Sequence, residues 1–325
     1  MVAPLALVYW EQDNRTAVHY LQVDRRAVAE GPLSRVRGMR TLSLAAGTIL
    51  DVDPAAAVDV AADAGFTSVG IWFDAATWSD AVADEVRRRS VARGVSILDI
   101  EPVMLMPAGS GAVDHGDAIV DAAVRVGARN VLVASRDTDD ERVAQRLREL
   151  AERLDRSAAS GAADVAASGA ADVRIVLEFL PILGVRTLPQ ALAIISAADH
   201  PRIGVLVDSL HLSRAGHLPA DLDGVARRLM PYLQVCDAPA VPHDASIPAL
   251  LHEALHARLL PGDGGLPIAA LLTAVPDVPI SLELRSQQLR DDYPDAVERA
   301  RVVRLAMERV LAREITTDEG EVEPE

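Results

Sequence analysis

The sequence predicts an α/β fold, a single (β/α)8 barrel, on three observations. Eight short apolar runs alternate with segments of helical period, which is typical of parallel strands joined by crossover helices. Half of the residues are hydrophobic and only 3% are aromatic, so the core must consist of Ala, Val, Leu and Ile, as in strands buried on both faces. A length of 325 residues also lies within the range of one barrel domain.

The chain divides into three parts. Residues 1–38 have mixed polarity and no sustained period, so they are expected to form an N-terminal extension, either ahead of a start at Met39 or as a strap packed on the barrel. Residues 39–315 carry the barrel pattern. Residues 316–325 are acidic and end near a proline, which predicts a short disordered tail.

The expected elements follow one another regularly. The strands are expected at 42–46, 68–72, 95–100, 130–134, 174–178, 203–208, 232–236 and 279–284. Helical periods fit between them, for example at 54–64 with a proline in the first turn, at 78–93 and at 139–156. A duplicated segment, Ser-Gly-Ala-Ala-Asp-Val at 160–165 and again at 168–173, is interpreted as a flexible insertion at the face of the barrel that does not hold active sites.

Composition excludes several classes of function. The chain contains no lysine, which excludes Schiff-base, pyridoxal-phosphate and Walker-type sites. A net charge of -16 argues against nucleic acid as a partner. The single cysteine forms no internal disulfide, and no apolar run is long enough for a membrane helix or a secretory signal, so a cytoplasmic protein is expected.

Four of the late strands close with a polar residue, and barrel active sites lie at these carboxyl ends. The residues are Glu178, Asp208, Gln234 and Glu283. Three carboxylates at one rim repel one another, and a divalent cation is the usual means of stabilising such a group. With the amide oxygen of Gln234 as a fourth ligand, the set favours Mn²⁺ or Mg²⁺. A single carboxylate of this kind can equally cap a helix or pair with arginine.

Other residues near the same rim are candidate substrate contacts. His211, three residues after Asp208, suits a hydrogen-bond donor or proton carrier. Arg258 precedes a glycine-rich turn and suits a carboxylate or phosphate, although a solvated arginine on a structural turn is the alternative. Glu101 is expected either to bind substrate hydroxyls or to point outward. Trp72 is expected either to form an apolar wall for a sugar ring or to serve packing alone.

The ordered set of these motifs resembles the sugar phosphate isomerase/epimerase family of xylose-isomerase-like TIM barrels. The motifs are Glu178, Asp208-Ser209-Leu210-His211, Gln234-Val235-Cys236-Asp237, Arg258-Leu259-Leu260-Pro261-Gly262-Asp263-Gly264 and Leu282-Glu283. The resemblance implies one divalent metal ion, Mn²⁺, Mg²⁺ or Co²⁺, held by Glu178, Asp208, the residue at 234 and Glu283. It also implies substrate contacts by His211 and Arg258 and proton exchange by the two glutamates. The departure is Gln234, where the family often has histidine.

These observations predict a metal-dependent isomerase or epimerase of a small sugar, sugar phosphate or related ketone, working through an enediolate. Two alternatives stay open: a dehydratase on the same scaffold, and a ligand-binding barrel without turnover. A barrel endonuclease is disfavoured, because it needs a histidine-rich metal cluster and a basic surface. The expected partner is a carbohydrate-like small molecule, with no nucleic acid and no membrane, and a homo-oligomer is left open.

Overall fold

The computed structural model describes residues 40–160 and 173–318. The expected N-terminal extension, the duplicated segment apart from its first and last residues, and the end of the acidic tail lie outside the described residues. Within the described ranges, no helix combines the length and the apolar character needed to cross a membrane.

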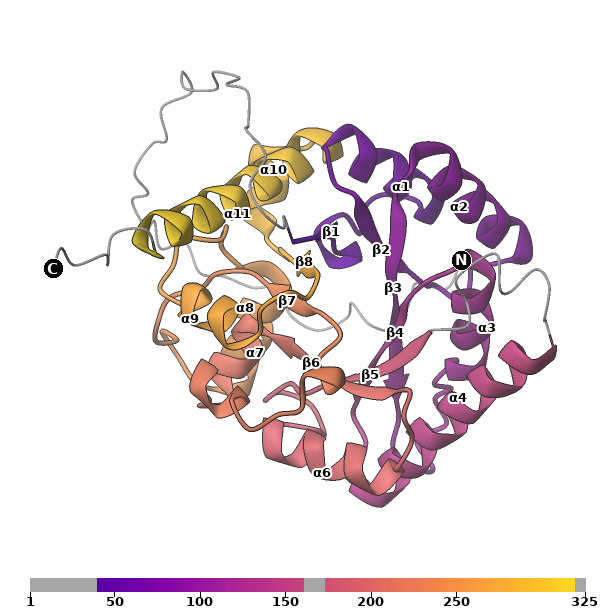
Figure 1. Ribbon diagram of the computed structural model, residues 1–325. Helices are drawn as coiled ribbons and strands as arrows, with labels where there is room; N and C mark the ends of the chain where they lie inside the picture. Colours follow the sequence, from indigo (N-terminus) through magenta and orange to yellow (C-terminus); the bar gives the residue numbers. More distant parts are fainter. Residues whose placement is uncertain (1–39, 161–172, 319–325) are drawn as a thin grey trace, which may run out of the picture. The chain divides into compact units, whose positions relative to one another are not determined.

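Eight parallel strands close into a barrel in the order of the sequence, with β1 paired to β8, as the sequence predicts (Figure 1). Each strand lies within about two residues of its expected position except the third, which is longer. The bounds are β1 Leu42–Leu44, β2 Ser68–Trp72, β3 Ser96–Leu105, β4 Asn130–Ser135, β5 Arg174–Glu178, β6 Ile203–Asp208, β7 Leu233–Val235 and β8 Ile280–Leu282.

Helices surround the barrel (Figure 1). They are α1 Pro54–Asp63, α2 Asp80–Arg93, α3 Gly116–Val126, α4 Asp140–Ser160, α6 Leu188–Ala198, α7 Ser209–Arg214, α8 Ile247–His256, α9 Ile268–Ala274, α10 Gln287–Asp292 and α11 Ala296–Asp318, with short 3-10 turns at η1 Ala46–Thr48, η3 Pro219–Leu222 and η4 Arg227–Leu229. The structure describes α11 as far as Asp318, so residues 316–318 of the expected acidic tail belong to the end of this helix, and the rest of the tail lies outside the described residues.

Local sequence signals set the helix ends. Pro54 occupies the first turn of α1, where its missing N–H costs no hydrogen bond. The Ser79 hydroxyl accepts a hydrogen bond from the backbone N–H of Val82 and caps α2, and Gly94 ends that helix in the left-handed conformation. The turns between helices and strands are therefore encoded locally, and they deliver each strand to the barrel in register.

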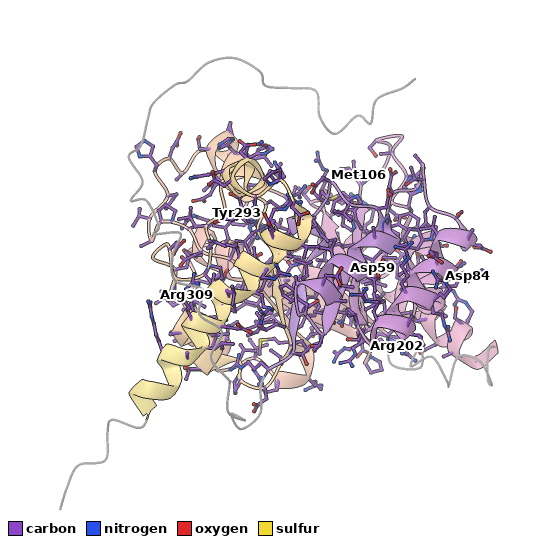
Figure 2. All side chains as sticks on the ribbon, turned by 90° about the horizontal axis from the view of Figure 1, so that it is seen from above. Asp59, Asp84, Met106, Arg202, Tyr293 and Arg309 are labelled. Atoms are coloured by element: carbon purple, nitrogen blue, oxygen red, sulfur yellow. The ribbon has the colours of Figure 1, made fainter. Side chains whose placement is uncertain are left out.

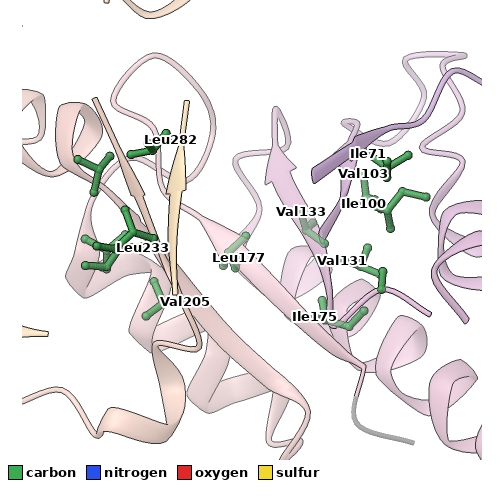
Figure 3. Packing of buried hydrophobic residues seen from close by; sticks show 14 of the residues in the cluster. Ile71, Ile100, Val103, Val131, Val133, Ile175, Leu177, Val205, Leu233 and Leu282 are labelled. Carbon is green, nitrogen blue, oxygen red and sulfur yellow. The ribbon is translucent and has the colours of Figure 1, made fainter. Parts of the chain in front are cut away.

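The core has two layers that follow from the alternation of side chains along each strand. Outward-facing residues pack with the helices in one large cluster, of which Figure 3 shows members from neighbouring strands, such as Ile175 and Leu177. A second, separate cluster contains Leu98, Leu132, Val176, Leu206 and Tyr232. Because these residues come from adjacent strands and alternate with the outer set, they fill the interior of the barrel.

The third strand departs from the prediction because it is irregular. It was expected to end at Ile100, but it continues through Pro102 to Leu105. Its register shifts against β2 after Val69 and against β4 between Ile100 and Val103, and such bulges absorb a residue and turn the following side chains. The bulges accommodate the proline, which cannot donate to the ladder, and Glu101 beside it is buried.

Charged side chains cover the outer helices, as Figure 2 shows for Asp59 on α1 and Asp84 on α2. Arg89 pairs with Asp59 at 2.6 Å, and Arg125 pairs with Asp84 at 2.7 Å. Exposed pairs of this kind each contribute only ~0–1 kcal/mol. The stability of the barrel therefore rests mainly on its two apolar layers.

Candidate active site

Three of the four predicted strand-end residues reach the interior because each lies two residues after a residue of the interior cluster. Glu178 lies two residues after Val176, Asp208 two after Leu206, and Gln234 two after Tyr232, and those three precursors belong to the interior cluster. A spacing of two returns a side chain to the same face of a strand. Glu283 follows β8 directly, and all four residues are buried.

Arg258 joins two of these carboxylates. Its Nη1 lies 2.7 Å from Oδ2 of Asp208 and 3.0 Å from Oε2 of Glu283. Its Nε donates to the carbonyl of Ala254 at 2.9 Å, and the whole side chain is buried. The guanidinium thus supplies a fixed positive charge between two carboxylates that would otherwise repel each other in a low-dielectric environment.

Asp208 also caps the N-terminus of α7. Its Oδ1 accepts hydrogen bonds from the backbone N–H groups of Leu210 at 2.7 Å and His211 at 3.2 Å. Burial alone would raise the pKa of Asp208, but the charge of Arg258 and these hydrogen bonds hold it below its usual range. The side chain is therefore an anion at neutral pH, and its capping role fixes the position of His211.

His211 and Glu178 lie side by side. The imidazole Nε2 is 3.8 Å from Oε1 of Glu178 and 3.4 Å from Nη2 of Arg258. Burial lowers the pKa of His211 to about 4, so the ring is neutral at pH 7. Burial also raises the pKa of Glu178, and the negative charges of Glu283 and Asp208 raise it further.

One group of three side chains has the geometry to hold a metal ion. Ligand atoms of Glu178, Asp208 and His211 lie within 4.8 Å of one another. The sequence predicts Glu178 and Asp208 as ligands and His211 as a substrate contact, so the structure brings the histidine into the same group. Glu283 is joined to this group through Arg258.

Gln234 lies beside Asp208 and Ser281 in the sheet. It is fully buried, and neither its amide oxygen nor its amide nitrogen has a hydrogen-bond partner among the described residues. Oε1 of Glu178 also lacks a hydrogen bond to the described part of the chain. Buried polar atoms are nearly always paired, so these atoms point to a missing partner. A divalent cation fits the two oxygens, Oε1 of Gln234 and Oε1 of Glu178, whereas the amide nitrogen cannot ligate a metal.

Two buried carboxylates stand on β3. Glu101, a predicted substrate contact, is buried, and burial followed by the charges of Asp99 and Glu283 raises its pKa well above the usual range. Asp99 was missed by sequence reasoning. Its side chain occupies space left by Gly70, where an added Cβ would lie 2.4 Å from Oδ1, and burial raises its pKa to about 7. The β3 bulge hides its inward orientation from a simple alternation pattern.

Trp72, the predicted apolar wall, is half-buried at the end of β2. The guanidinium carbon of Arg285 lies 5.8 Å from the centroid of its ring, within the range of a cation–π contact. Arg285 was also missed from the sequence. It follows Glu283 by two residues. In an extended segment that spacing returns a side chain to the same face, so it could have indicated Arg285 as a neighbour of the site.

The glycine-rich turn after Arg258 is occupied by a side chain of the protein itself. Oδ2 of Asp237 accepts from the N–H groups of Gly262 at 2.9 Å and Gly264 at 3.0 Å, and Oδ1 accepts from Leu266 at 3.0 Å. The turn therefore has a structural role in holding the Arg258 segment against β7.

Cys236 is no nucleophile, because burial raises the pKa of its thiol to about 12.

Known proteins of the same fold cover most of this chain. The family model of the xylose isomerase-like TIM barrel matches residues 58–306. No curated protein matches the chain. Among solved structures, a fusion of a xylose isomerase-like TIM barrel with 4-hydroxyphenylpyruvate dioxygenase has a TM-score of 0.67 and 21% identity over 88% of this chain, which spans 45% of that protein.

Three further structures show the range of the fold. An IOLI protein with a bound zinc atom has a TM-score of 0.69 and 16% identity, covering 85% of this chain and 99% of that one. The D-psicose 3-epimerase of Clostridium cellulolyticum H10 has a TM-score of 0.59 and 14% identity, covering 84% and 99%. A probable 3-DHS dehydratase, AsbF, from Bacillus anthracis has a TM-score of 0.56 and 15% identity, covering 81% and 98%.

These structural likenesses show the fold alone, whereas the family match spans most of the described barrel. Glu178 and Asp208 close β5 and β6 of that barrel, and Glu283 directly follows β8. The chain belongs to the xylose isomerase-like TIM barrel family.

Proposed function

We propose that this protein is a metal-dependent isomerase or epimerase that transfers a proton on the carbon next to the carbonyl of a small sugar-like substrate. The proposal rests on the environment of the Glu178 carboxylate. Its Oε1 is buried and has no hydrogen-bond partner among the described residues, and it stands beside His211 at the carboxyl end of the barrel. A general base needs such a free oxygen within reach of the substrate.

The residues that would hold the metal are Glu178, Asp208, Gln234 and Glu283, with the His211 imidazole as a further donor within reach of the first two. Their oxygen-rich character favours Mn²⁺, Mg²⁺ or Co²⁺. A bound ion would polarise the carbonyl and the neighbouring hydroxyl and lower the energy of the enolate.

Four side chains have separate roles in the proposed reaction. Glu178 removes the proton, and Glu283 is the partner that returns it for epimerisation. Arg258 offsets the charges of Asp208 and Glu283 and keeps both in place through bonds of 2.7 Å and 3.0 Å. Glu101, with its raised pKa, serves as a hydrogen-bond donor to a substrate hydroxyl.

A dehydratase is the second candidate, and one observation favours it. The two glutamates are not equivalent: Glu283 is paired with Arg258, whereas Glu178 faces the neutral His211 at 3.8 Å. A single base beside a proton carrier suits abstraction of a proton followed by loss of a β-hydroxyl. The same enolate serves both reactions, so only the fate of the intermediate differs.

Product analysis separates the two candidates. Protein supplied with Mn²⁺ is incubated with a panel of ketoses, inososes and hydroxylated oxo acids, and products are identified by mass and NMR. An isomer or epimer of unchanged mass supports the proposal, and loss of one water supports the dehydratase. Binding of panel members without any conversion would contradict both and favour a ligand-binding barrel.

A further inference from the structure

Arg285 is an arginine at the rim whose guanidinium forms no ion pair and donates no hydrogen bond within the described residues, although the negative charges of Glu283 and Glu101 act on it. The guanidinium lies over the ring of Trp72, with its carbon 5.8 Å from the ring centroid. Arg258, which also lies at the rim, is bonded to Asp208, Glu283 and Ala254. A guanidinium stays charged at every physiological pH, so a sheltered one that forms no direct ion pair is suited to bind an anion.

The charge of Arg285 acts on the candidate active site itself. Burial is the main influence on the pKa values of Glu101, Glu178 and His211, and the positive charge of Arg285 contributes to all three. A ligand bound by Arg285 would therefore lie within electrostatic range of the proposed base.

Two other places at this rim that commonly bind anions are already filled. The N–H groups of the glycine-rich turn at 262–266 are taken by the carboxylate of Asp237. The first N–H groups of α7 are taken by Asp208. No lysine exists in the chain to replace them. The guanidinium of Arg285 remains at this rim, and its planar fork can bind the two oxygens of a carboxylate side by side. Phosphate sites commonly use several backbone N–H donors, and here those donors are taken.

We propose that Arg285, supported by Trp72, forms a carboxylate subsite, so that the substrate is a hydroxylated oxo acid. The substrate assignment rests on the proposed function, whereas the binding of a carboxylate at Arg285 does not. Trp72 has a positioning role: its ring holds the guanidinium plane in place.

Three probes that share one polyol chain test the subsite: D-gluconate carries a carboxylate, sorbitol none, and sorbitol 6-phosphate a phosphate. Binding is measured by calorimetry with the intact protein, with Arg285→Gln, and with Arg290→Gln as the control. Arg290 lies on α10 and is bonded to Gln287, so its loss removes the same charge outside the subsite. Trp72→Phe keeps a ring, and Trp72→Ala removes it.

We expect gluconate to bind more tightly than sorbitol and Arg285→Gln to weaken gluconate roughly 10- to 100-fold while leaving sorbitol unchanged. Arg290→Gln should bind gluconate normally, and Trp72→Phe should retain affinity that Trp72→Ala loses. The subsite would be overturned if gluconate does not bind or binds no more tightly than sorbitol. It would also be overturned if Arg285→Gln binds gluconate as well as the wild type does, or if the protein prefers sorbitol 6-phosphate.

The proposed chemistry is judged separately by deuterium exchange. Deuterium exchange on carbon, together with gluconate binding that does not depend on Arg285, would mean that the substrate is neutral. Arg285-dependent binding without exchange by any oxo acid would leave the subsite standing and remove the enolate reaction.

Discussion

The Nη1 atom of Arg258 lies 2.7 Å from Oδ2 of Asp208, and both side chains are buried. An isolated buried charge is costly, so each of these groups depends on the other. The same nitrogen reaches Glu283, and the guanidinium extends toward His211. Arg258 is therefore the centre of the charge balance in the site.

Replacing Arg258 with methionine should lower the free energy of unfolding at neutral pH by about 3–5 kcal/mol, because two buried carboxylates lose their counter-ion. The folded-state pKa of Asp208 is lowered, so its contribution is present above its unfolded value and is lost as pH falls through the folded value. Urea unfolding curves of wild type and variant should therefore converge in acid. A variant as stable as wild type at neutral pH would show that the pair contributes nothing.

Gln234 offers a cleaner test of the metal site than the carboxylates do. Its amide has no hydrogen-bond partner within the described residues, so Gln234→Met should leave the metal-free protein as stable as before or more stable. Calorimetry should find about one Mn²⁺ per chain in the wild type and weaker binding in the variant, with a larger loss in Asp208→Ala. Undiminished Mn²⁺ affinity in both variants would rule out the proposed ligand set.

Gly47 determines how closely Glu283 can lie to β1. A Cβ at this position would stand 2.4 Å from Oε1 of Glu283, so Gly47→Ala should displace the glutamate while the fold remains. We expect turnover to fall by roughly 10²-fold, the cost of a misplacement of about 1 Å. Gly224→Ala is the matched control, because nothing lies within 4 Å of its added Cβ. Equal activity of the two variants would argue that Glu283 takes no part in the reaction.

Asp99 should make stability depend on pH. Burial raises its folded-state pKa to about 7, whereas an unfolded aspartate titrates near ~3.9. Between these values the folded state keeps a proton that the unfolded state releases, so the free energy of unfolding falls as pH rises through this window. Asp99→Asn removes this slope.

The variant should gain stability relative to wild type between about pH 4 and pH 8, by at most about 4 kcal/mol. Denaturant titrations at the two pH values measure the difference. Parallel stabilities of wild type and variant over this range would mean that Asp99 titrates normally.

The fold was largely predictable because strand and helix periods are local properties. Glu178, Asp208 and Gln234 could be placed together from the ends of their strands, and Glu283 could be placed with them from the end of the eighth strand. Asp99 and Arg285 could not. The inward position of Asp99 depends on a bulge set by the neighbouring strand. The absence of a direct ion pair at Arg285, within the described residues, depends on the carboxylates that Arg258 already binds. Both are tertiary properties that no single segment encodes.

The central claim is that Glu178 removes a proton from carbon, and deuterium wash-in tests it most directly. With a converted substrate in D2O, the wild type should place deuterium on the carbon next to the carbonyl. Glu178→Gln should lower that exchange by ~10²–10⁴-fold or more, because it keeps the shape but loses the basic oxygen. Glu149→Gln, an exposed site on α4, should exchange normally. Wild-type exchange rates in Glu178→Gln, or conversion without any carbon-bound deuterium, would contradict the account.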